Sequence, residues 1–403
     1  MAAMTNGNGN GKEQQPRWTK DDWTDFAHVG PDALAGQYLR RFWHPIYRSE
    51  DLDPGRAKPV RLLGEDFTLY RGELSPSPLA GGGGQPHLLA YRCAHRGTQL
   101  STGWVEGDNL RCFYHGWMYD GDGQCVEQPA EPEPFCQKIR VRSYPVRDYL
   151  GLVFAYLREG EPPELPRYPE FENDEEIREV VIREPWPCNY FNRIENAPDL
   201  VHLTFTHYQF GFKVPTKIEA VETDYGMETR SEYPDGKAQQ VHFLMPTLSR
   251  YDVEPWHPAE TRWRERIGWR VPIDDDHYVD VLLTQIHLTG EAKEEFLART
   301  KTRDAERSEA VRQIPIEGTA VLAGEKTIKD VANKAILTEV EDFATLVGQG
   351  AIADRPAEHL GSTDIGLILI RKMYTREMRA LAEGEPLAQW RAPEALEVVT
   401  ALV

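Results

Sequence analysis

Two short cysteine–histidine pairs constrain the fold of this chain more than any other feature of its sequence. The runs RCAHRGTQL and RCFYHGW contain Cys93-x-His95 and, after sixteen intervening residues, Cys112-x2-His115. Each pair lies at the end of a predicted short strand, so two facing loops can present four ligands to one metal centre. The fold therefore has to bring these two loops together.

Two kinds of metal site use two cysteines and two histidines. A structural zinc site holds them in a tetrahedron, whereas in a Rieske [2Fe–2S] centre two thiolates bind one iron and two imidazoles bind the other. Zinc sites of this composition usually group the cysteines in one pair and the histidines in the other. Here each loop carries one of each, and Gly97 and Gly116 follow the histidines where tight turns are needed. The order of the ligands favours the cluster over zinc.

The remaining cysteines and the charge balance limit the class of protein. Cys125, Cys136 and Cys188 have no ligand-like partner in the sequence, and we expect them to pack as small apolar residues. Five cysteines with an odd count fit a reducing compartment, so a cytoplasmic location is predicted. The net charge of −19 has the wrong sign for binding nucleic acid or an anionic membrane surface. No apolar run approaches the ~20 residues of a membrane-spanning helix.

A second group of candidate ligands lies in the run NRIENAPDLVHLTFTH, which contains Asp199, His202 and His207. Asp199 and His202 share one helix face, whereas His202 and His207 lie about 140° apart on a regular helix. Both histidines can bind one metal only if the helix ends or distorts between them. Two histidines and a carboxylate with open positions form the facial triad of non-haem Fe(II) enzymes that activate O2.

This second group is a weak signal when it is taken alone, because such histidines are more often residues of a core or a helix end. The cysteine–histidine motif upstream changes that judgement. A one-electron carrier and an O2-activating iron form a coherent pair, since O2 activation needs electrons that are delivered singly.

Together these motifs resemble the catalytic α subunit of a Rieske non-haem iron oxygenase, over about residues 35–380. The stretch from 348 to 378 is similar to the phthalate-dioxygenase branch, which is commonly built from α subunits alone. Respiratory Rieske proteins carry an additional cysteine in each ligand loop. Thr98 and Tyr114 occupy those places here, so the corresponding disulfide is absent.

The resemblance implies a role for each candidate residue. Cys93, His95, Cys112 and His115 would bind the cluster, and His202 and His207 would bind the mononuclear iron. The third iron ligand in the family is an Asp from a later helix, here the run ILTEVEDFATLVGQG, which places it at Asp342. From the residues alone, Glu339 and Glu341 stay competitors, and all three also fit a solvated charge run.

The family also implies a link between the two centres. The Asp three residues before the first iron histidine, here Asp199, would bridge to the cluster residue His115 of a neighbouring subunit. Many members have an amide four residues before that Asp, where this chain has Glu195, with Asn196 next to it. The polar group nearest the iron is therefore left open.

Strand-like runs, such as 240–245 and 262–271, are followed by helices without steady βαβ alternation, which predicts an α+β fold. The proline- and acid-rich segment 158–179 is the best candidate for a domain boundary. The resemblance implies an N-terminal all-β Rieske domain and a C-terminal catalytic domain in which helices cover an antiparallel sheet. We expect a flexible tail at residues 1–16, followed by an N-terminal helical segment at 17–44 that packs on the catalytic domain. The Rieske domain is expected at 45–158 and the catalytic mononuclear iron domain at 159–403. The longer helices are predicted at 192–207, 291–313, 329–348 and 363–383.

The expected function is that of a terminal oxygenase, which hydroxylates or oxidatively demethylates a small aromatic substrate with O2. Its electrons would come from NAD(P)H through a separate reductase or ferredoxin, since the chain has no convincing G-x-G-x-x-G motif between a strand and a helix. The family implies a homotrimer. Pocket-lining segments are predicted at 191–192, 242–247 and 282–285.

Two alternatives stay open at the level of sequence. One is a Rieske-type electron carrier without oxygenase activity, which would hold one metal centre per chain. The other is a zinc-stapled binding protein, which would be colourless.

Overall fold

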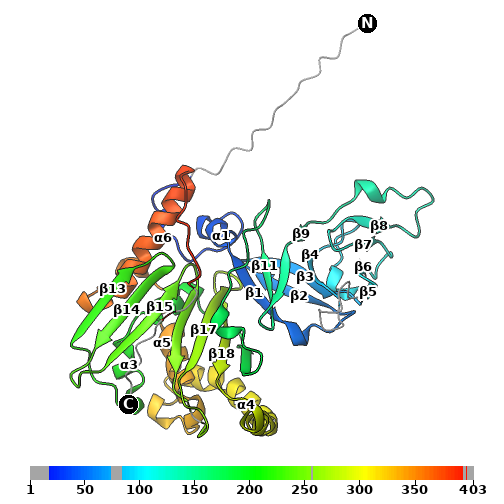
Figure 1. Ribbon diagram of the computed structural model, residues 1–403. Coiled ribbons are helices and arrows are strands. Elements are labelled where there is room, and N and C mark those ends of the chain that lie inside the picture. Colours follow the sequence, from blue (N-terminus) through cyan, green and yellow to red (C-terminus); the bar gives the residue numbers. More distant parts are fainter. Residues whose placement is uncertain (1–17, 74–83, 256, 394–395, 397–403) are drawn as a thin grey trace.

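The structure is a computed structural model that describes residues 18–73, 84–255, 257–393 and 396 (Figure 1). The N-terminal β-rich part and the C-terminal part, built on one large sheet, lie side by side along the long direction of the molecule (Figure 1). The tail predicted at 1–16 lies outside the described residues. Among the helices of the described ranges, none combines the length and the apolar character needed to cross a membrane.

The N-terminal part consists of three small antiparallel sheets, with strand orders β1-β11-β10, β2-β3-β4-β9 and β5-β6-β7-β8. Its strands are β1 (Trp43–Arg48), β2 (Ala57–Leu62), β3 (Glu65–Arg71), β4 (Pro86–Ala90), β5 (Trp104–Glu106), β6 (Asn109–Arg111), β7 (Met118–Tyr119), β8 (Cys125–Glu127), β9 (Ser143–Tyr144), β10 (Val146–Tyr149) and β11 (Leu152–Tyr156). The loops that carry the two cysteine–histidine pairs leave from β4 and β6, at the end of the domain that points away from the large sheet (Figure 1).

The β2–β3 hairpin ties the two parts of the molecule together. Its two turn residues, Leu63 and Gly64, both have positive φ, at 50° and 77°, as a two-residue hairpin turn requires. Their N–H groups donate to the carbonyls of Pro272 and Ile273 at the end of the large sheet, at 3.0 and 2.9 Å. The tip of the N-terminal domain is therefore hydrogen-bonded to the C-terminal domain.

The C-terminal part is built on one seven-stranded antiparallel sheet with the order β12-β18-β17-β16-β15-β14-β13. Its strands are β12 (Ile177–Ile182), β13 (Lys217–Glu222), β14 (Gly226–Glu232), β15 (Ala238–Leu244), β16 (Leu248–Val253), β17 (Arg264–Pro272) and β18 (Tyr278–Ile286). On one face Trp269 packs against Phe154 of the N-terminal domain, with ring centroids 5.7 Å apart. Apolar residues of both parts form one continuous buried core.

Six α-helices complete the part of the chain that the structure describes. They are α1 (Leu34–Leu39), α2 (Tyr190–Asn196), α3 (His202–Phe205), α4 (Gly290–Leu322), α5 (Leu337–Gly348) and α6 (Ile365–Glu383). Helix α5 packs along α4, whereas α6 lies against β13 and β14 (Figure 1). The segment that precedes α1 contacts α2 and α6 through Phe26. Its ring stacks on Phe191 and meets the edge of Tyr374, with ring centroids 4.6 and 5.9 Å apart.

The predicted α+β class is confirmed, but three predicted helices have different bounds. The helix expected at 192–207 is two helices, α2 and α3, because Pro198 in the intervening segment cannot donate the hydrogen bond that continuity requires. The helix expected from 329 begins only at Leu337, after a turn that Asn333 caps through the N–H of Ala335. Helix α4 continues through Pro315 to Leu322, since it packs against α5 there.

Candidate metal centres

The two cysteine–histidine loops fold into equivalent turns. In each loop the cysteine N–H donates to the carbonyl five residues later, and the glycine N–H donates back to the cysteine carbonyl, at distances from 2.8 to 3.0 Å. Gly97 and Gly116 have φ values of 72° and 77°, which side chains rarely adopt. The repeated turn places Cys93 and Cys112 at matching positions of two adjacent loops.

The side chains of these loops meet in pairs, thiol with thiol and imidazole with imidazole. Cys93 and Cys112 are buried, and the rings of His95 and His115 lie with their centroids 4.5 Å apart. Burial and the nearby Cys93 thiol raise the pKa of the Cys112 thiol, although backbone N–H groups act against this effect. The Nδ1 atom of His95 is buried and has no hydrogen-bond partner among the described residues. Two buried thiols and an unpartnered imidazole nitrogen fit the donor set of a Rieske cluster.

Two aromatic residues support this arrangement. The Trp117 ring stacks on the His95 ring, with centroids 4.4 Å apart and an interplanar angle of 7°. The Tyr119 hydroxyl lies 3.1 Å from Cys93 Sγ. Hydrogen bonds to cluster sulfurs are among the features that set a cluster's reduction potential. Neither contact was anticipated from the sequence, because the ligand spacing carries no information about side chains that follow the loops.

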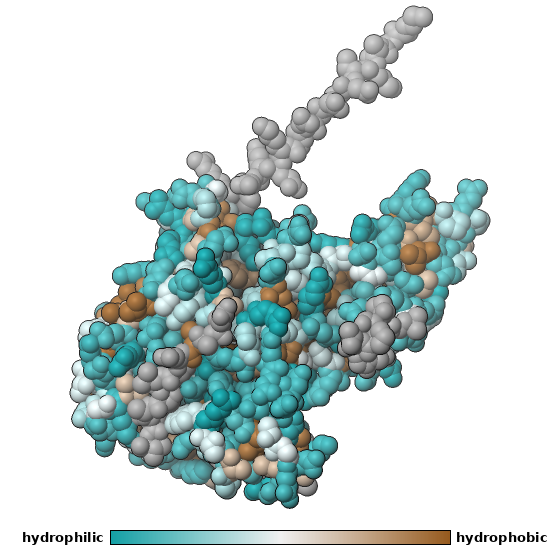
Figure 2. All heavy atoms as spheres, in the orientation of Figure 1, coloured by the Kyte–Doolittle hydropathy of each residue, from teal (hydrophilic) through white to brown (hydrophobic). Residues whose placement is uncertain are grey.

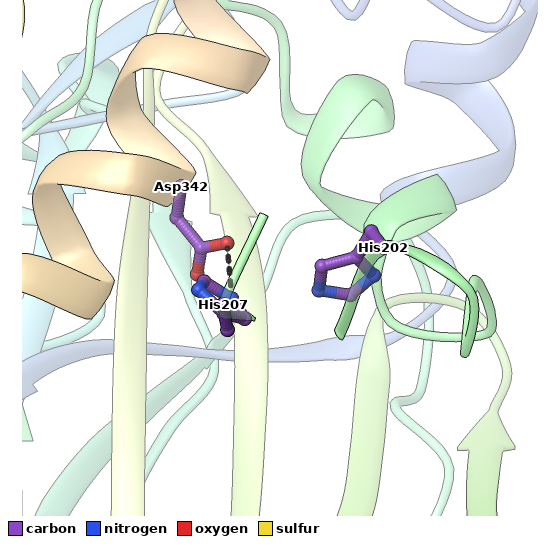
Figure 3. Close-up of side chains that lie close together, drawn as sticks. All are labelled: His202, His207 and Asp342. Atoms are coloured by element: carbon purple, nitrogen blue, oxygen red, sulfur yellow. Dashed lines mark ion pairs between the residues drawn. The ribbon is translucent and has the colours of Figure 1, made fainter. Parts of the chain in front are cut away.

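The second group is assembled from two segments that are far apart in the sequence. His202 begins α3, His207 lies just after that helix ends, and Asp342 comes from α5 (Figure 3). The break after Phe205 allows both histidines to face the same point, as their spacing requires. One ligand atom from each of the three residues lies within 4.8 Å of the others, and His207 Nε2 is 3.3 Å from Asp342 Oδ1. The structure therefore brings together the three residues that were expected to hold one metal.

Hydrogen bonds orient both histidines. His202 Nδ1–H donates to the backbone carbonyl of Asp199, and His207 Nδ1–H donates to Glu341 Oε2 at 2.7 Å. Gln209 Nε2 donates to the same Glu341 oxygen at 2.9 Å. Metal-binding histidines usually donate their second ring nitrogen to a carbonyl or carboxylate, which fixes the tautomer. Each imidazole therefore keeps its Nε2 atom free for a metal.

The electrostatics of the group suit a cation. Burial disfavours the charged carboxylate of Asp342, but Arg193 and His207 outweigh it and hold its pKa well below the usual range. Burial lowers the pKa of His202. Burial also disfavours the charged form of His207, but the close carboxylates of Asp342 and Glu341 outweigh it and raise the pKa of His207. Asp342 Oδ1 is buried and has no well-formed hydrogen bond within the described part of the chain. The donor set fits Fe(II), which two histidines and one carboxylate bind in many oxygenases.

Asp199 lies between the metal group and the surface. Its carboxylate accepts hydrogen bonds from the N–H groups of Val201 at 3.1 Å and His202 at 3.3 Å. Its side chain is 32% exposed, whereas the His202 side chain is 15% exposed. The carboxylate is therefore within reach of a partner outside the chain.

The two acidic competitors for the metal have different surroundings. Glu341 is buried against His207, so it supports a histidine and does not lie among the three grouped ligand atoms. Glu339 is partly exposed and pairs with Arg183 at 3.3 Å. A solvated charge run describes neither Glu341 nor Asp342, because α5 packs on both sides.

The residue left open nearest the iron is also placed by the structure. Glu195 turns away from the metal group and is buried between two arginines, Arg355 at 3.0 Å and Arg371. A side chain of the same helix that does contact the metal group is Arg193, which donates to Asp342 Oδ2 at 3.1 Å. Sequence reasoning missed Arg193, because its partner lies 149 positions away.

Within one chain the two groups lie in different domains. The cluster loops are at the far end of the N-terminal domain, and α3 lies in the C-terminal part beside the large sheet (Figure 1). The core shared by the two domains holds them in this arrangement. The geometry of a single chain therefore separates the two groups.

Comparison with known proteins identifies the N-terminal domain and finds relatives that match most of the chain. The Rieske [2Fe-2S] domain model matches residues 42–145. The chain is 33% identical over 386 residues to the 5,5'-dehydrodivanillate O-demethylase oxygenase subunit of a Sphingobium species. That match covers 91% of this chain and 82% of the relative. It is 31% identical to the phenoxybenzoate dioxygenase subunit alpha of Ectopseudomonas oleovorans, with 88% and 84% covered.

A solved structure supports the fold independently. The complex between oxygenase and ferredoxin in carbazole 1,9a-dioxygenase contains a chain that superposes with a TM-score of 0.60 at 18% identity, covering 91% of this chain and 95% of that one. The predicted resemblance is confirmed by the sequence relatives. This chain belongs to the Rieske non-haem iron oxygenases and is an oxygenase subunit of that family.

Proposed function

We propose that this oxygenase subunit acts on a small aromatic acid, which it hydroxylates or from which it removes an O-methyl group. The relatives support this class, since their names refer to a dehydrodivanillate O-demethylase and a phenoxybenzoate dioxygenase. We assign separate ligands to the cluster and to the mononuclear iron, and we assign Asp199 to the electron path between the two centres. The cluster ligands are Cys93, His95, Cys112 and His115, and the iron ligands are His202, His207 and Asp342.

The single observation that carries this proposal is the convergence of His202, His207 and Asp342 within 4.8 Å in a chain that also has a Rieske domain. When bound, the cluster supplies single electrons and the iron supplies the site of O2 reduction. The residues of the chain do the rest. Asp199 and Glu341 hold the imidazole rings so that Nε2 faces the metal, and burial of His207 and Asp342 keeps bulk water from the charged carboxylate.

We further propose that the active form is a homotrimer in which the cluster of one copy lies beside the iron of the next. Two exposed apolar groups support such a head-to-tail ring. Phe113 and Tyr114 precede His115 and are 53% and 48% exposed, and Phe205, close to His207, is 67% exposed. Hydrophobic surface near the end of the N-terminal domain is visible over β7 and β8 (Figure 2). The Asp199 carboxylate would then accept a hydrogen bond from a cluster histidine of the neighbour.

The electron donor belongs to the same proposal. We infer that NAD(P)H reduces a separate reductase or ferredoxin, which then reduces the cluster. The oxygenase and ferredoxin of carbazole 1,9a-dioxygenase form such a complex. The predicted cytoplasmic location stays a prediction from the cysteine content.

The test is a metal count followed by an oxygen-uptake assay. Purified protein should contain three irons and two acid-labile sulfides per chain, two of the irons in the cluster. With a surrogate reductase, methoxybenzoates and phenoxybenzoates should stimulate O2 uptake, with neutral aryl ethers as the comparison. His207→Ala should lose one iron and all substrate-dependent uptake while it keeps the cluster's absorbance. Two irons per chain and no uptake with any substrate would favour an electron carrier instead.

A further inference from the structure

Arg193 contacts a proposed iron ligand from outside the ligand motif. It lies in α2, its side chain is 11% exposed, and its Nη1 donates to Asp342 Oδ2 at 3.1 Å and to Asn196 Oδ1 at 2.5 Å. An arginine does not lose its proton in a protein, so this group is a permanent cation. One oxygen of the Asp342 carboxylate therefore carries a charge-assisted hydrogen bond.

The two oxygens of Asp342 have different surroundings. Oδ2 accepts the hydrogen bond from Arg193, whereas Oδ1 faces His207 Nε2 at 3.3 Å and has no well-formed hydrogen bond to any residue that the structure describes. Oδ1 is thus the oxygen that faces the two histidines. The hydrogen bond from Arg193 uses a lone pair of Oδ2 and draws its charge toward the guanidinium, so Oδ2 is the poorer metal ligand of the two oxygens.

The position of Arg193 is also fixed from the sheet. Its Nε lies 3.5 Å from Asp280 Oδ2, and the other oxygen of Asp280 lies 3.4 Å from Arg270 Nε. Asp280 and Arg270 are direct cross-strand partners on β18 and β17, and both are buried. The four groups alternate in sign from Asp342 to Arg270. Buried charges are tolerated when they are paired with opposite charges in this way. Arg193 has an acidic partner on each side, so its position does not depend on Asp342 alone.

We propose that Arg193 is a positioning residue that reserves Oδ2 of Asp342, so that this carboxylate binds the catalytic iron through Oδ1 alone. The inference rests on the proposed function, because it takes Asp342 as an iron ligand. Carboxylates bind metals through one or two oxygens. A second oxygen from Asp342 would occupy one of the open positions that a facial triad provides. Arg193 thereby keeps that position open for an external ligand.

The experiment measures how tightly nitric oxide, a neutral analogue of O2, binds to the reduced, iron-loaded protein. The electron paramagnetic resonance signal of the iron–nitrosyl complex reports binding without turnover. Arg193→Met removes the donor with little change of length, Arg193→Lys keeps a cation and a donor, and Arg183→Met is the matched control. Arg183 contacts α5 as well, through Glu339 at 3.3 Å. We expect Arg193→Met to weaken nitric oxide binding about tenfold, with the lysine variant and the control near wild type.

Unchanged nitric oxide affinity in Arg193→Met at full iron content would overturn the inference. If that variant fails to fold, a crystal structure of the iron-loaded wild-type protein decides the question. One Asp342 oxygen on the iron, with the other on Arg193, supports the proposal, and two oxygens on the iron refute it. A wild-type protein that binds no third iron would instead refute the proposed function itself.

Discussion

At the scale of single residues, the surroundings of each carboxylate on α5 decide its role. Glu339, Glu341 and Asp342 lie within four positions of one another, but only the last two are buried. Glu341 accepts hydrogen bonds from His207 and Gln209, so its charge is directed at the histidine. A carboxylate in this position raises the basicity of a ligating imidazole.

We predict that Glu341→Gln lowers the affinity of the mononuclear site for Fe(II) by about 10- to 100-fold, because the amide keeps the size of the side chain but removes its charge. The measurement is an iron titration of protein that retains its cluster. Glu339→Gln, on the same helix, is the control and should leave the affinity unchanged. Equal affinities in the two variants would show that Glu341 has no influence on the metal.

Asp199→Asn should keep both metals and abolish turnover. The amide still accepts hydrogen bonds from Val201 and His202, so the backbone turn that orients His202 is preserved. The variant loses the carboxylate charge that would bridge to a cluster histidine of a neighbouring copy. Iron content and cluster absorbance should match the wild type, while the rate at which the iron reoxidises a pre-reduced cluster falls. Full activity in this variant would remove Asp199 from the electron path.

The sequence indicated some of these residues and not others for a physical reason. The cysteine–histidine spacing and the Asp199–His202–His207 spacing are local, so each reports on a single loop or turn. Glu341 lies 134 positions from His207, and the three acidic residues of α5 have the same chemistry. Only the packing of α5 on both sides distinguishes them, and the family resemblance, not the spacing, pointed to Asp342.

At the scale of secondary structure, the close contact between α4 and α5 positions Asp342. A Cβ added at Gly318 in α4 would lie 2.2 Å from a ring atom of Phe343, the residue after Asp342. Only a glycine allows the helices to approach this closely. A shift of α5 at this contact would therefore move Asp342, since Phe343 is its neighbour in the chain.

Gly318→Ala should destabilise the protein by about 1–3 kcal/mol through overpacking, partly offset by about 1 kcal/mol of improved helix propensity. It should also weaken iron binding, because α5 has to shift, and leave the cluster's absorbance unchanged. Gly348→Ala is the matched control, since its Cβ would meet only the flexible end of Leu322 at 3.2 Å. Thermal unfolding and iron titration of both variants check this, and equal effects would contradict it.

Strands were easier to predict than helices in this chain. The runs expected at 240–245 and 262–271 became β15 and β17 with shifts of two residues or fewer at each end. Alternating or apolar runs bounded by turn residues define such strands directly. Helix ends depended on tertiary contacts, such as the packing that carries α4 past Pro315, which the sequence does not display.

At the scale of the whole molecule, one buried histidine makes stability depend on pH. His44 in β1 is 1% exposed, its Nε2–H donates to the Leu39 carbonyl, and burial lowers its pKa to about 4. The unfolded chain has an ordinary histidine pKa near 6.5. Below that value the unfolded state binds a proton that the folded state excludes, so His44 destabilises the fold as pH falls from about 6.5 to 4.

Replacing His44 by Gln should remove this contribution, which amounts to about 3 kcal/mol between the two pH values. The glutamine amide can still donate to the Leu39 carbonyl. Denaturant unfolding at several pH values should therefore give a difference between variant and wild type that changes across this window and is constant above pH 7. A constant difference at every pH would mean that His44 stays neutral in both states.

The assembly could not be predicted from composition or periodicity, because nothing in a sequence counts subunits. The proposed homotrimer rests on the family resemblance and on exposed apolar residues such as Phe113 and Phe205. In contrast, the two-part architecture followed from the change in pattern after the proline-rich segment near residue 160.

The β2–β3 hairpin has a consequence for how activity depends on enzyme concentration. The two domains of one chain are held together by hydrogen bonds from Leu63 and Gly64 and by a shared apolar core. The N-terminal domain therefore cannot swing round to bring its cluster loops next to the metal group of the same chain. If the proposed trimeric ring is the active form, a dissociated subunit keeps its colour and all its metals but has no catalytic activity. Specific activity should then rise steeply with enzyme concentration where the ring forms, while absorbance per chain stays constant. A rate per chain that is the same at every dilution would show that each copy works alone.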